Sequence, residues 1–191
     1  TSALTTDTST RYHPDNVPRG CYRLPTEAEW EYSTRAGSTT RFSYGDDADY
    51  SQLTNYAWYK DNSEDLGSSH PDYGTHPGGQ KLANPWGLYD VHGNLAEWTY
   101  DSWPSTYSTT SQTDPSGDST NINRVIRGGI WASEAADLRS AARGGGCVGC
   151  SSRNVGLRLV LVMPNFGDQG GNDSANASPI ASDDFAITSL N

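Results

Sequence analysis

Cys147 and Cys150 have the C-x-x-C spacing that occurs in redox centres and in half of many zinc sites. A redox pair of this kind opens a helix in a thioredoxin-like fold, and a zinc site needs a second pair of ligands. Glycine and serine flank the two cysteines here, and Cys21 is the only other thiol. A redox or metal role is therefore the minor alternative, and we expect a local disulfide or two thiols without function. Cys21 is most simply a small buried residue.

Other catalytic motifs are missing from the sequence. It contains no Ser-His-Asp order, no P-loop and no H-E-x-x-H pattern. The glycine tract 144–146 lacks the flanking residues of a phosphate-binding loop, so we expect no nucleotide site. The four histidines lie in turns, and at most one is expected near the cysteines: His13, His70, His76 and His92.

The charge of the chain limits its partners. A formal charge of −10 argues against general nucleic-acid binding and against an anionic membrane surface. No apolar run approaches the length of a membrane span, so we expect no membrane insertion. Six arginines stand in the segment 124–158, namely Arg124, Arg127, Arg139, Arg143, Arg153 and Arg158. We expect them to be framework residues that pair with carboxylates elsewhere in the fold.

One helix can be predicted from local sequence. Thr26 and Glu29 form a capping box, in which each side chain bonds the backbone N–H of the other residue. Pro25 and Trp30 occupy the hydrophobic-staple positions, and Gly37 supplies a stop. These residues predict a helix near 27–36.

The rest of the chain predicts short strands between long loops. Tyrosine (11) and tryptophan (6) outnumber phenylalanine (3), and 20 glycines interrupt the chain. Residues 38–85 are turn-rich and predict loops with one or two short strands. Strands are predicted around 95–100, in "NRVIRGGIW" and at 155–162. The expected class is α+β, rich in irregular loops.

Five motifs occur in order: "YRLPTEAEWEY", "NPWGLYDVHGNLAEWTYD", "RVIRGGIW", "LRSAAR" and "RNVGLRLV". Together, over about residues 20–162, they resemble the formylglycine-generating enzyme (sulfatase-modifying factor) family. The resemblance implies that family's variant of the C-type lectin fold. The N-terminal strands that precede the helix in the family are missing from this chain. Either a second chain supplies them or the fold is incomplete.

The resemblance also implies a calcium site in "YDVHGNLAEW". Asp90 and Glu97 match the family's side-chain ligands, and Gly93 and Leu95 match ligands that act through backbone carbonyls. Carboxylate and carbonyl oxygens suit a hard cation, and a glycine permits the tight turn that directs them inward. The alternative is that Asp90 and Glu97 cap turns or pair with framework arginines. Calcium is the expected structural cofactor.

The family's oxidase chemistry is not expected. The resemblance implies a copper site made by two cysteines shortly after the Gly-Gly corner, and the corresponding interval here reads "IWASEAAD" without a thiol. Two soft thiolates are what such a copper(I) site needs, so copper binding is not expected and the chain is interpreted as a non-enzyme. The alternative function is a metal-dependent oxidase-type enzyme that uses Cys147 and Cys150.

The interval from Ile130 to Ser152 is instead predicted to contact a ligand. The chain also resembles the variable proteins of diversity-generating retroelements, which have a similar lectin-like fold. In those proteins the ligand-facing positions are diversified by mutation, while the frame residues around them stay fixed. Asn codons randomised in this way can encode Ala, Ser, Gly, Asp, Val, Cys and Ile, among others. Most residues between the frame elements of this interval are of these types. The sequence is compatible both with a diversified binding surface and with a non-catalytic module of fixed sequence. The expected contact residues are Ile130, Trp131, Ala132, Ser133, Glu134, Ala136, Asp137, Val148, Ser151 and Ser152.

Three segments are expected along the chain. Residues 1–20 form an extended lead-in, residues 21–162 the lectin-like domain, and residues 163–191 a polar linker. The end of the linker resembles the opening of a cadherin-like or immunoglobulin-like repeat. We therefore expect a secreted or cell-surface bacterial protein with a protein or glycan ligand, and Trp58, Trp103 or Trp131 at the edge of the contact surface.

Overall fold

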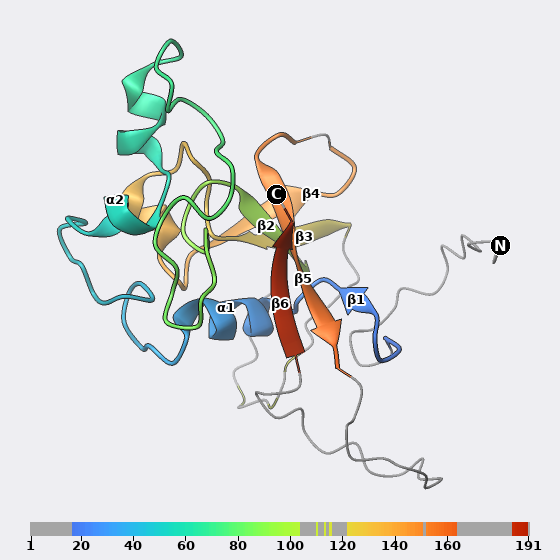
Figure 1. Ribbon diagram of the computed structural model, residues 1–191. Coiled ribbons are helices and arrows are strands. Elements are labelled where there is room, and N and C mark those ends of the chain that lie inside the picture. Colours follow the sequence, from blue (N-terminus) through green and yellow to red (C-terminus); the bar gives the residue numbers. More distant parts are fainter. Residues whose placement is uncertain are drawn as a thin grey trace, which may run out of the picture.

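One six-stranded sheet organises the computed structural model (Figure 1). The structure describes residues 17–103, 122–150 and 152–163, the single residues 110, 113 and 115, and the backbone of 185–190. The strands are β1 (Tyr22–Arg23), β2 (Ala96–Ser102), β3 (Asn123–Arg127), β4 (Arg143–Cys147), β5 (Val155–Val162) and β6 (Phe185–Leu190). Their order is β1-β5-β2-β3-β4, with β6 also paired to β5. The β2–β5 pair is parallel and the other pairs are antiparallel.

The predicted helix is confirmed as α1 (Glu27–Arg35). The backbone N–H of Glu29 donates to Thr26 Oγ1 at 3.2 Å, and that of Thr26 donates to Glu29 Oε2 at 2.8 Å. Trp30 is buried and its indole donates to Glu97 of β2 at 2.7 Å. Asp101, at the other end of β2, accepts from the backbone N–H of Glu27. The N-terminal half of the helix is therefore attached to β2 at two points, Glu27 and Trp30.

Residues 38–85 form a lobe without strands, so the one or two strands predicted there are wrong. The lobe holds α2 (Leu53–Tyr56) and the 3₁₀ turns η2 (Lys60–Asn62) and η3 (Glu64–Leu66). Its only β contacts are the isolated bridges Phe42–Gly45 and Trp58–Gly93. Aromatic packing replaces strand pairing here, because Tyr44 stacks on both Phe42 and Tyr56.

Three strands were not predicted from the sequence, and the first of them is the two-residue β1. Residues 143–147, expected in a glycine-rich loop, pair with β3 as strand β4. Residues 185–190, expected in the linker, form β6, which lies alongside β5 in Figure 1. Residues 1–16 of the predicted lead-in, and residues 164–184 and 191 of the predicted linker, lie outside the described residues.

Three of the six arginines are confirmed as framework residues. Arg127 binds Glu27 and Glu31, Arg143 also binds Glu27, and Arg158 binds Glu97. Each pair joins one element of the fold to another. Within the described part of the chain, no helix is long and apolar enough to cross a membrane.

The prediction that Cys21 is buried is wrong. Its side chain is exposed and carries a free thiol. Cys21 directly precedes β1, which is only two residues long. Because β1 is a two-residue strand at the edge of the sheet, Cys21, which precedes it, is left in contact with solvent.

Candidate functional site

The interval 130–137 is held at both ends by buried residues. It begins after Gly128 and Gly129, which both have positive φ, and it ends at Leu138, which is fully buried. A Cβ atom on Gly129 would lie 2.3 Å from Cδ2 of Leu138, so only glycine allows this approach. The last residues of the interval form the 3₁₀ turn η4 (Ala135–Leu138). The residues on either side of the interval, Gly129 and Leu138, therefore pack closely against each other.

Some of the expected contact residues also hold the interval together. The hydroxyl of Ser133 accepts from the N–H of Ile130 at 3.0 Å, and its carbonyl accepts from the N–H of Lys60 at 3.1 Å. Glu134 forms an ion pair with the ammonium group of Lys60. Ala136 and Asp137 are exposed, and Ala132 is half-buried. The side chains of Ala132, Ala136 and Asp137 take no part in these contacts, so these are the positions where substitution should disturb the interval least.

Trp131 connects the interval to two other segments. Its backbone N–H donates to the carbonyl of Asn94 at 2.9 Å, and its indole donates to Asn154 Oδ1 at 3.3 Å. The ring of Tyr73 meets it edge-on, with centroids 4.9 Å apart. Sequence reasoning missed Tyr73, Lys60 and Asn154. Asn154 belongs to the motif RNVGLRLV, whereas Tyr73 and Lys60 lie in the turn-rich segment, where no sequence pattern indicates a contact with residues 130–137.

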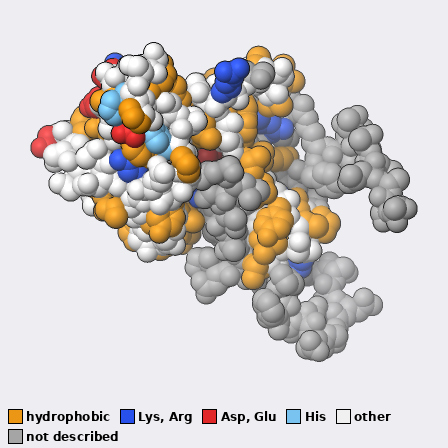
Figure 2. Space-filling view, turned by 45° about the horizontal axis from the view of Figure 1, so that its top comes forward, with side chains coloured by type: hydrophobic (Ala, Val, Ile, Leu, Met, Phe, Trp, Pro, Cys, Tyr) orange, Lys and Arg blue, Asp and Glu red, His pale blue; other side chains and the backbone are white. Residues whose placement is uncertain are grey.

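Aromatic and charged side chains of the lobe lie beside this interval. Trp58 stacks on His76 at 3.6 Å between ring centroids, and the Lys81 ammonium lies 3.8 Å from the centre of the Trp58 ring. Asp72 lies 3.8 Å from ring nitrogens of His70 and of His76. Figure 2 shows pale blue histidine side chains next to acidic ones on this lobe. Across the described residues, no group of three or more histidine, cysteine or acidic side chains is arranged to hold a metal ion.

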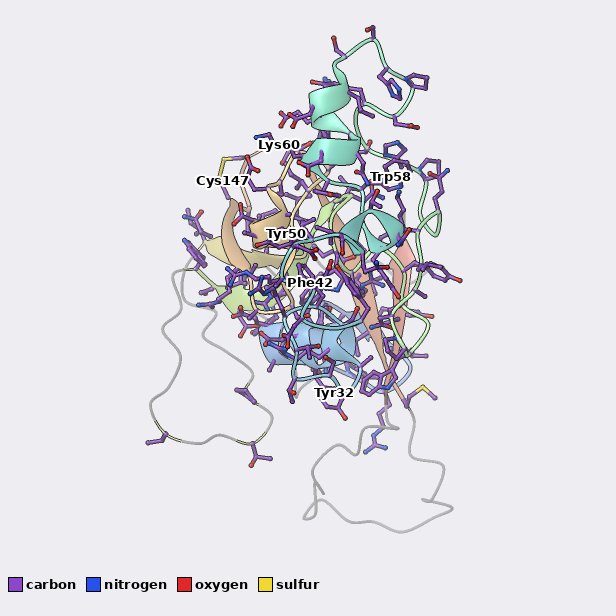
Figure 3. The ribbon with its side chains drawn as sticks, turned by 90° about the vertical axis from the view of Figure 1, so that its left-hand side faces the viewer. Tyr32, Phe42, Tyr50, Trp58, Lys60 and Cys147 are labelled. Carbon is purple, nitrogen blue, oxygen red and sulfur yellow. A yellow bond between two sulfur atoms is a disulfide. The ribbon has the colours of Figure 1, made fainter. Side chains whose placement is uncertain are left out.

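The second half of the expected surface is a turn closed by a disulfide. Cys147 and Cys150 are bonded to each other, which is the first of the two alternatives expected for them. Val148 is 58% exposed and Ser152 is exposed, whereas Ser151 lies outside the described residues. Figure 3 shows Cys147 in the same upper part of the molecule as Trp58 and Lys60, with Tyr32 at the opposite end.

A cavity of about 400 Å³ opens between the disulfide turn and the sheet. Its lining is mostly apolar with one arginine: Leu24, Trp98, Tyr100, Arg124, Val148, Cys150, Ser152 and Val155. Arg124 lies over the ring of Tyr100 and donates to the Tyr100 carbonyl. The cavity places Val148 and Ser152, two of the expected contact residues, beside two aromatic rings.

Packing explains why β4 contains glycine at positions 145 and 146. A Cβ atom on Gly145 would lie 2.4 Å from Cδ1 of Trp103, and one on Gly146 would lie 2.4 Å from Cη2 of Trp98. A side chain at either position must therefore displace a tryptophan ring. The tract that resembles a bland loop in the sequence is a strand against which two tryptophans lie.

The expected calcium ligands lie in one segment, where their present contacts are with protein. Both carboxylate oxygens of Glu97 are engaged: Oε1 accepts from Arg158 Nη2 at 2.6 Å, and Oε2 accepts from Arg158 Nε and from the Trp30 indole. Asp90 accepts from the N–H of Gly79 at 2.7 Å, and burial raises the pKa of its carboxyl. A calcium ion at Glu97 would have to displace Arg158. As placed, Glu97 is paired with Arg158 and not free for a metal ion, and calcium binding stays a prediction.

Gly93 and Leu95, the expected backbone ligands, lie in the turn between those two carboxylates. Gly93 has a φ of 79° and donates its N–H to the Gly128 carbonyl at 2.8 Å. A Cβ atom there would lie 2.1 Å from the carbonyl oxygen of Trp58. Glycine is therefore required at this turn by close packing, with or without a bound ion.

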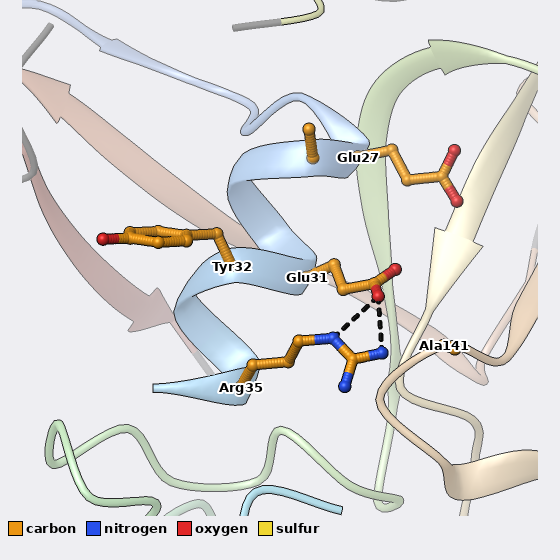
Figure 4. A pocket seen from close by; sticks show the side chains of 6 residues that line it. Glu27, Glu31, Tyr32, Arg35 and Ala141 are labelled. Carbon is orange, nitrogen blue, oxygen red and sulfur yellow. Dashed lines mark hydrogen bonds and ion pairs between the residues drawn. The ribbon is translucent and has the colours of Figure 1, made fainter. Parts of the chain in front are cut away.

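A second cavity, of about 460 Å³, lies along α1 (Figure 4). It is lined by Glu27, Ala28, Glu31, Tyr32, Arg35 and Ala141. Glu27 and Glu31 bind framework arginines, and Arg35 pairs with Glu31. These charges serve the attachment of α1, and none of the expected contact residues reaches the cavity.

The comparisons with known proteins agree with the motifs. The model of the sulfatase-modifying factor enzyme 1-like domain matches residues 3–163. The chain belongs to this family. Its relatives include the formylglycine-generating enzyme of Mus musculus, 34% identical over 147 residues, which cover 72% of this chain and 38% of the relative. The serine/threonine-protein kinase pkn1 of Chlamydia caviae is 36% identical over 142 residues, which cover 72% of this chain and 21% of the relative.

A solved structure is also similar to this chain. The Treponema denticola variable protein 1 has 37% identity and a TM-score of 0.60, over 72% of this chain and 46% of that one. The chain thus spans less than half the length of each of these three proteins. The predicted α+β fold, the family's variant of the C-type lectin fold, is confirmed, as is the family resemblance.

Proposed function

We propose that this chain is a non-enzymatic ligand-binding module of a secreted or cell-surface protein. Its contact surface lies in residues 130–152, and its ligand is a protein or a glycan. The observation that carries the proposal is the interval after the Gly-Gly corner. That interval has no cysteine, and between its buried flanking residues Gly128 and Leu138 it exposes Glu134, Ala136 and Asp137 to solvent.

Similarity to a variable protein supports a diversified form of this surface. Ala136, Asp137 and Val148 are exposed and Ala132 is half-buried, and all four are of the residue types that randomised Asn codons produce. DNA sequencing around the gene tests this part. A near-copy of the segment coding for 127–159, differing only at adenines and beside a reverse-transcriptase gene, is expected. The absence of any such copy would leave a plain contact module with a fixed sequence.

Binding itself is tested with a displayed library in which these four positions are randomised. Most members are expected to stay folded, since none of the four side chains is buried. Selection against immobilised proteins and glycans is expected to yield binders that lose affinity when the four positions are restored. A library that folds but yields no binders would contradict a contact surface here.

The rival function is a metal-dependent oxidase of the formylglycine-generating type that uses Cys147 and Cys150. Its support is the 34% identity to the mouse enzyme and the exposure of both cysteines. Against it, the two sulfur atoms are bonded to each other at the far end of β4 from the Gly-Gly corner. The corresponding test compares the chain with a variant that lacks both thiols.

A further inference from the structure

Strand β4 is an edge of the sheet. Within the described ranges it pairs with β3 alone, in the antiparallel register that sets Val125 opposite Gly145 and Asn123 opposite Cys147. Edge strands expose a row of backbone donors and acceptors to which another strand can bind. Natural edges are normally guarded by charges, proline or a bulge, and residues 144–146 have none of these.

The hydrogen bonds of β3 show which groups of β4 face outward. The carbonyl of Asn123 accepts from the N–H of Trp103, and the carbonyl of Val125 accepts from the Thr99 hydroxyl, so both residues point toward β2. Residues opposite one another in an antiparallel pair either exchange both hydrogen bonds or direct both groups away from each other. The N–H and C=O of Gly145 therefore point away from β3, where no described residue binds them.

Two tryptophans flank this open edge. Trp103 lies beside Gly145 and Trp98 beside Gly146. Side chains of successive strand residues point to opposite faces, so the two rings lie on opposite faces of the sheet edge. Arg143 stacks its guanidinium on Trp103 at 5.4 Å and also binds Glu27. Strand side chains point above and below the sheet, so another backbone can lie beside β4 at the usual strand spacing of about 4.8 Å.

We propose that β4 binds an extended polypeptide segment by strand addition, through the backbone of Gly145, with Trp103 and Trp98 contacting its alternate side chains. This assigns a ligand class to the proposed contact surface and rests on that proposed function. Backbone recognition needs no side chain from β4, which explains how three glycines can serve a binding surface. The cavity beside Val148 and Trp98 suits an apolar side chain of the bound segment.

The test uses a displayed library of linear decapeptides, selected on the whole chain. A selected peptide is then synthesised with one N-methylated amide at a time. Methylation is expected to weaken binding about tenfold or more at alternate positions only, because every second N–H of an added strand faces its partner. Equal affinity for all methylated peptides, or the failure of every linear peptide to bind, would overturn strand addition.

A pair of variants tests the same contact from the protein side. Trp103→Ala removes the indole ring with which a proline at position 145 would clash. The double variant Trp103→Ala, Gly145→Pro also removes the outward-facing N–H of residue 145. The inward bonds of β4 come from residues 144 and 146, so the sheet should keep its pairing. The double variant is expected to bind the peptide about tenfold more weakly than Trp103→Ala, with an unchanged circular dichroism spectrum. Equal binding by the two folded variants would overturn the role of Gly145.

The two proposals fail in different ways. If no linear peptide binds but the library randomised at Ala132, Ala136, Asp137 and Val148 yields binders, only strand addition is wrong. If a peptide binds through β4 while those four positions affect no ligand, the wider contact surface is wrong. If neither experiment yields a binder, both proposals are overturned.

Discussion

Arg158 of β5 and Glu97 of β2 form a buried, two-pronged ion pair. The Nε–Oε2 and Nη2–Oε1 distances are 2.8 and 2.6 Å, and both side chains are at least nine-tenths buried. The same guanidinium donates to the carbonyl of Tyr89 at 2.9 Å. One arginine thus ties the parallel β2–β5 pair to the turn that precedes β2.

Loss of this arginine should be costly. Arg158→Met would leave the Glu97 carboxylate buried without its cation, which costs about 3–5 kcal/mol of unfolding free energy. Arg153→Met changes an exposed arginine of the same motif and should change stability by less than about 0.5 kcal/mol. Urea unfolding of the two variants measures the difference. Equal stability would show that Glu97 finds another partner.

The ion pair also gives a test for calcium. An ion at Asp90 and Glu97 must compete with Arg158, so calcium should raise the melting temperature of Arg158→Met more than that of the wild type. A chelator should reverse the shift, and adding Glu97→Gln to Arg158→Met should abolish it. No calcium-dependent shift in either protein would rule out a structural calcium site at these residues.

Asp101 should make stability fall as the pH rises from 4 to above 6. Burial, and then repulsion from Glu27, raise the pKa of this carboxyl to about 6, and Arg143 opposes the rise. The folded chain therefore holds the Asp101 proton more tightly than the unfolded chain does. The contribution is complete below pH 4 and is lost as the pH passes 6, to a total of about 3 kcal/mol.

Asp101→Asn tests that pH dependence, because an amide oxygen can still accept from the N–H of Glu27. The variant should gain stability over the wild type at pH 7.5 and lose that advantage at pH 4. Urea unfolding at several pH values gives the difference between the two proteins. A difference that does not change with pH would mean that Asp101 titrates normally.

The frame and the surface of the contact interval should respond differently to substitution. Gly129→Ala places a methyl group against Leu138 in a left-handed conformation and should cost about 1–3 kcal/mol. Ala136→Ser adds a hydroxyl to an exposed position seven residues later and should change stability by less than about 0.5 kcal/mol. Thermal unfolding compares the two. A comparable loss from both would contradict a frame that is independent of its surface.

Local rules predicted the parts of the fold that local contacts determine. Thr26 and Glu29 define the start of α1 within four residues of sequence, and "VGLRLVLV" coincides with β5. β4 was missed because glycine has low strand propensity, and because Trp98 and Trp103, against which its glycines lie, come more than 40 residues earlier in the chain. The aromatic lobe was misread for the same reason: stacking between Phe42, Tyr44 and Tyr56 has no sequence period.

The contact interval was located from its frame, and its internal order was not foreseen. Gly129 and Leu138 bound it as the motifs indicated, but the hydroxyl of Ser133 and the link from Glu134 to Lys60 became visible only in three dimensions. Such long-range contacts leave no local pattern. Tyr73, which meets Trp131 from the lobe, is the clearest example.

On the proposed function, the surface of residues 130–152 makes contacts and performs no thiol chemistry. The most direct measurement is a mass-spectrometric assay for formylglycine in a sulfatase-derived peptide incubated with the copper-supplied chain. We expect no product from the wild type and none from the Cys147→Ser, Cys150→Ser double variant. Formylglycine made by the wild type and lost in the double variant would overturn the non-enzymatic function and establish the oxidase.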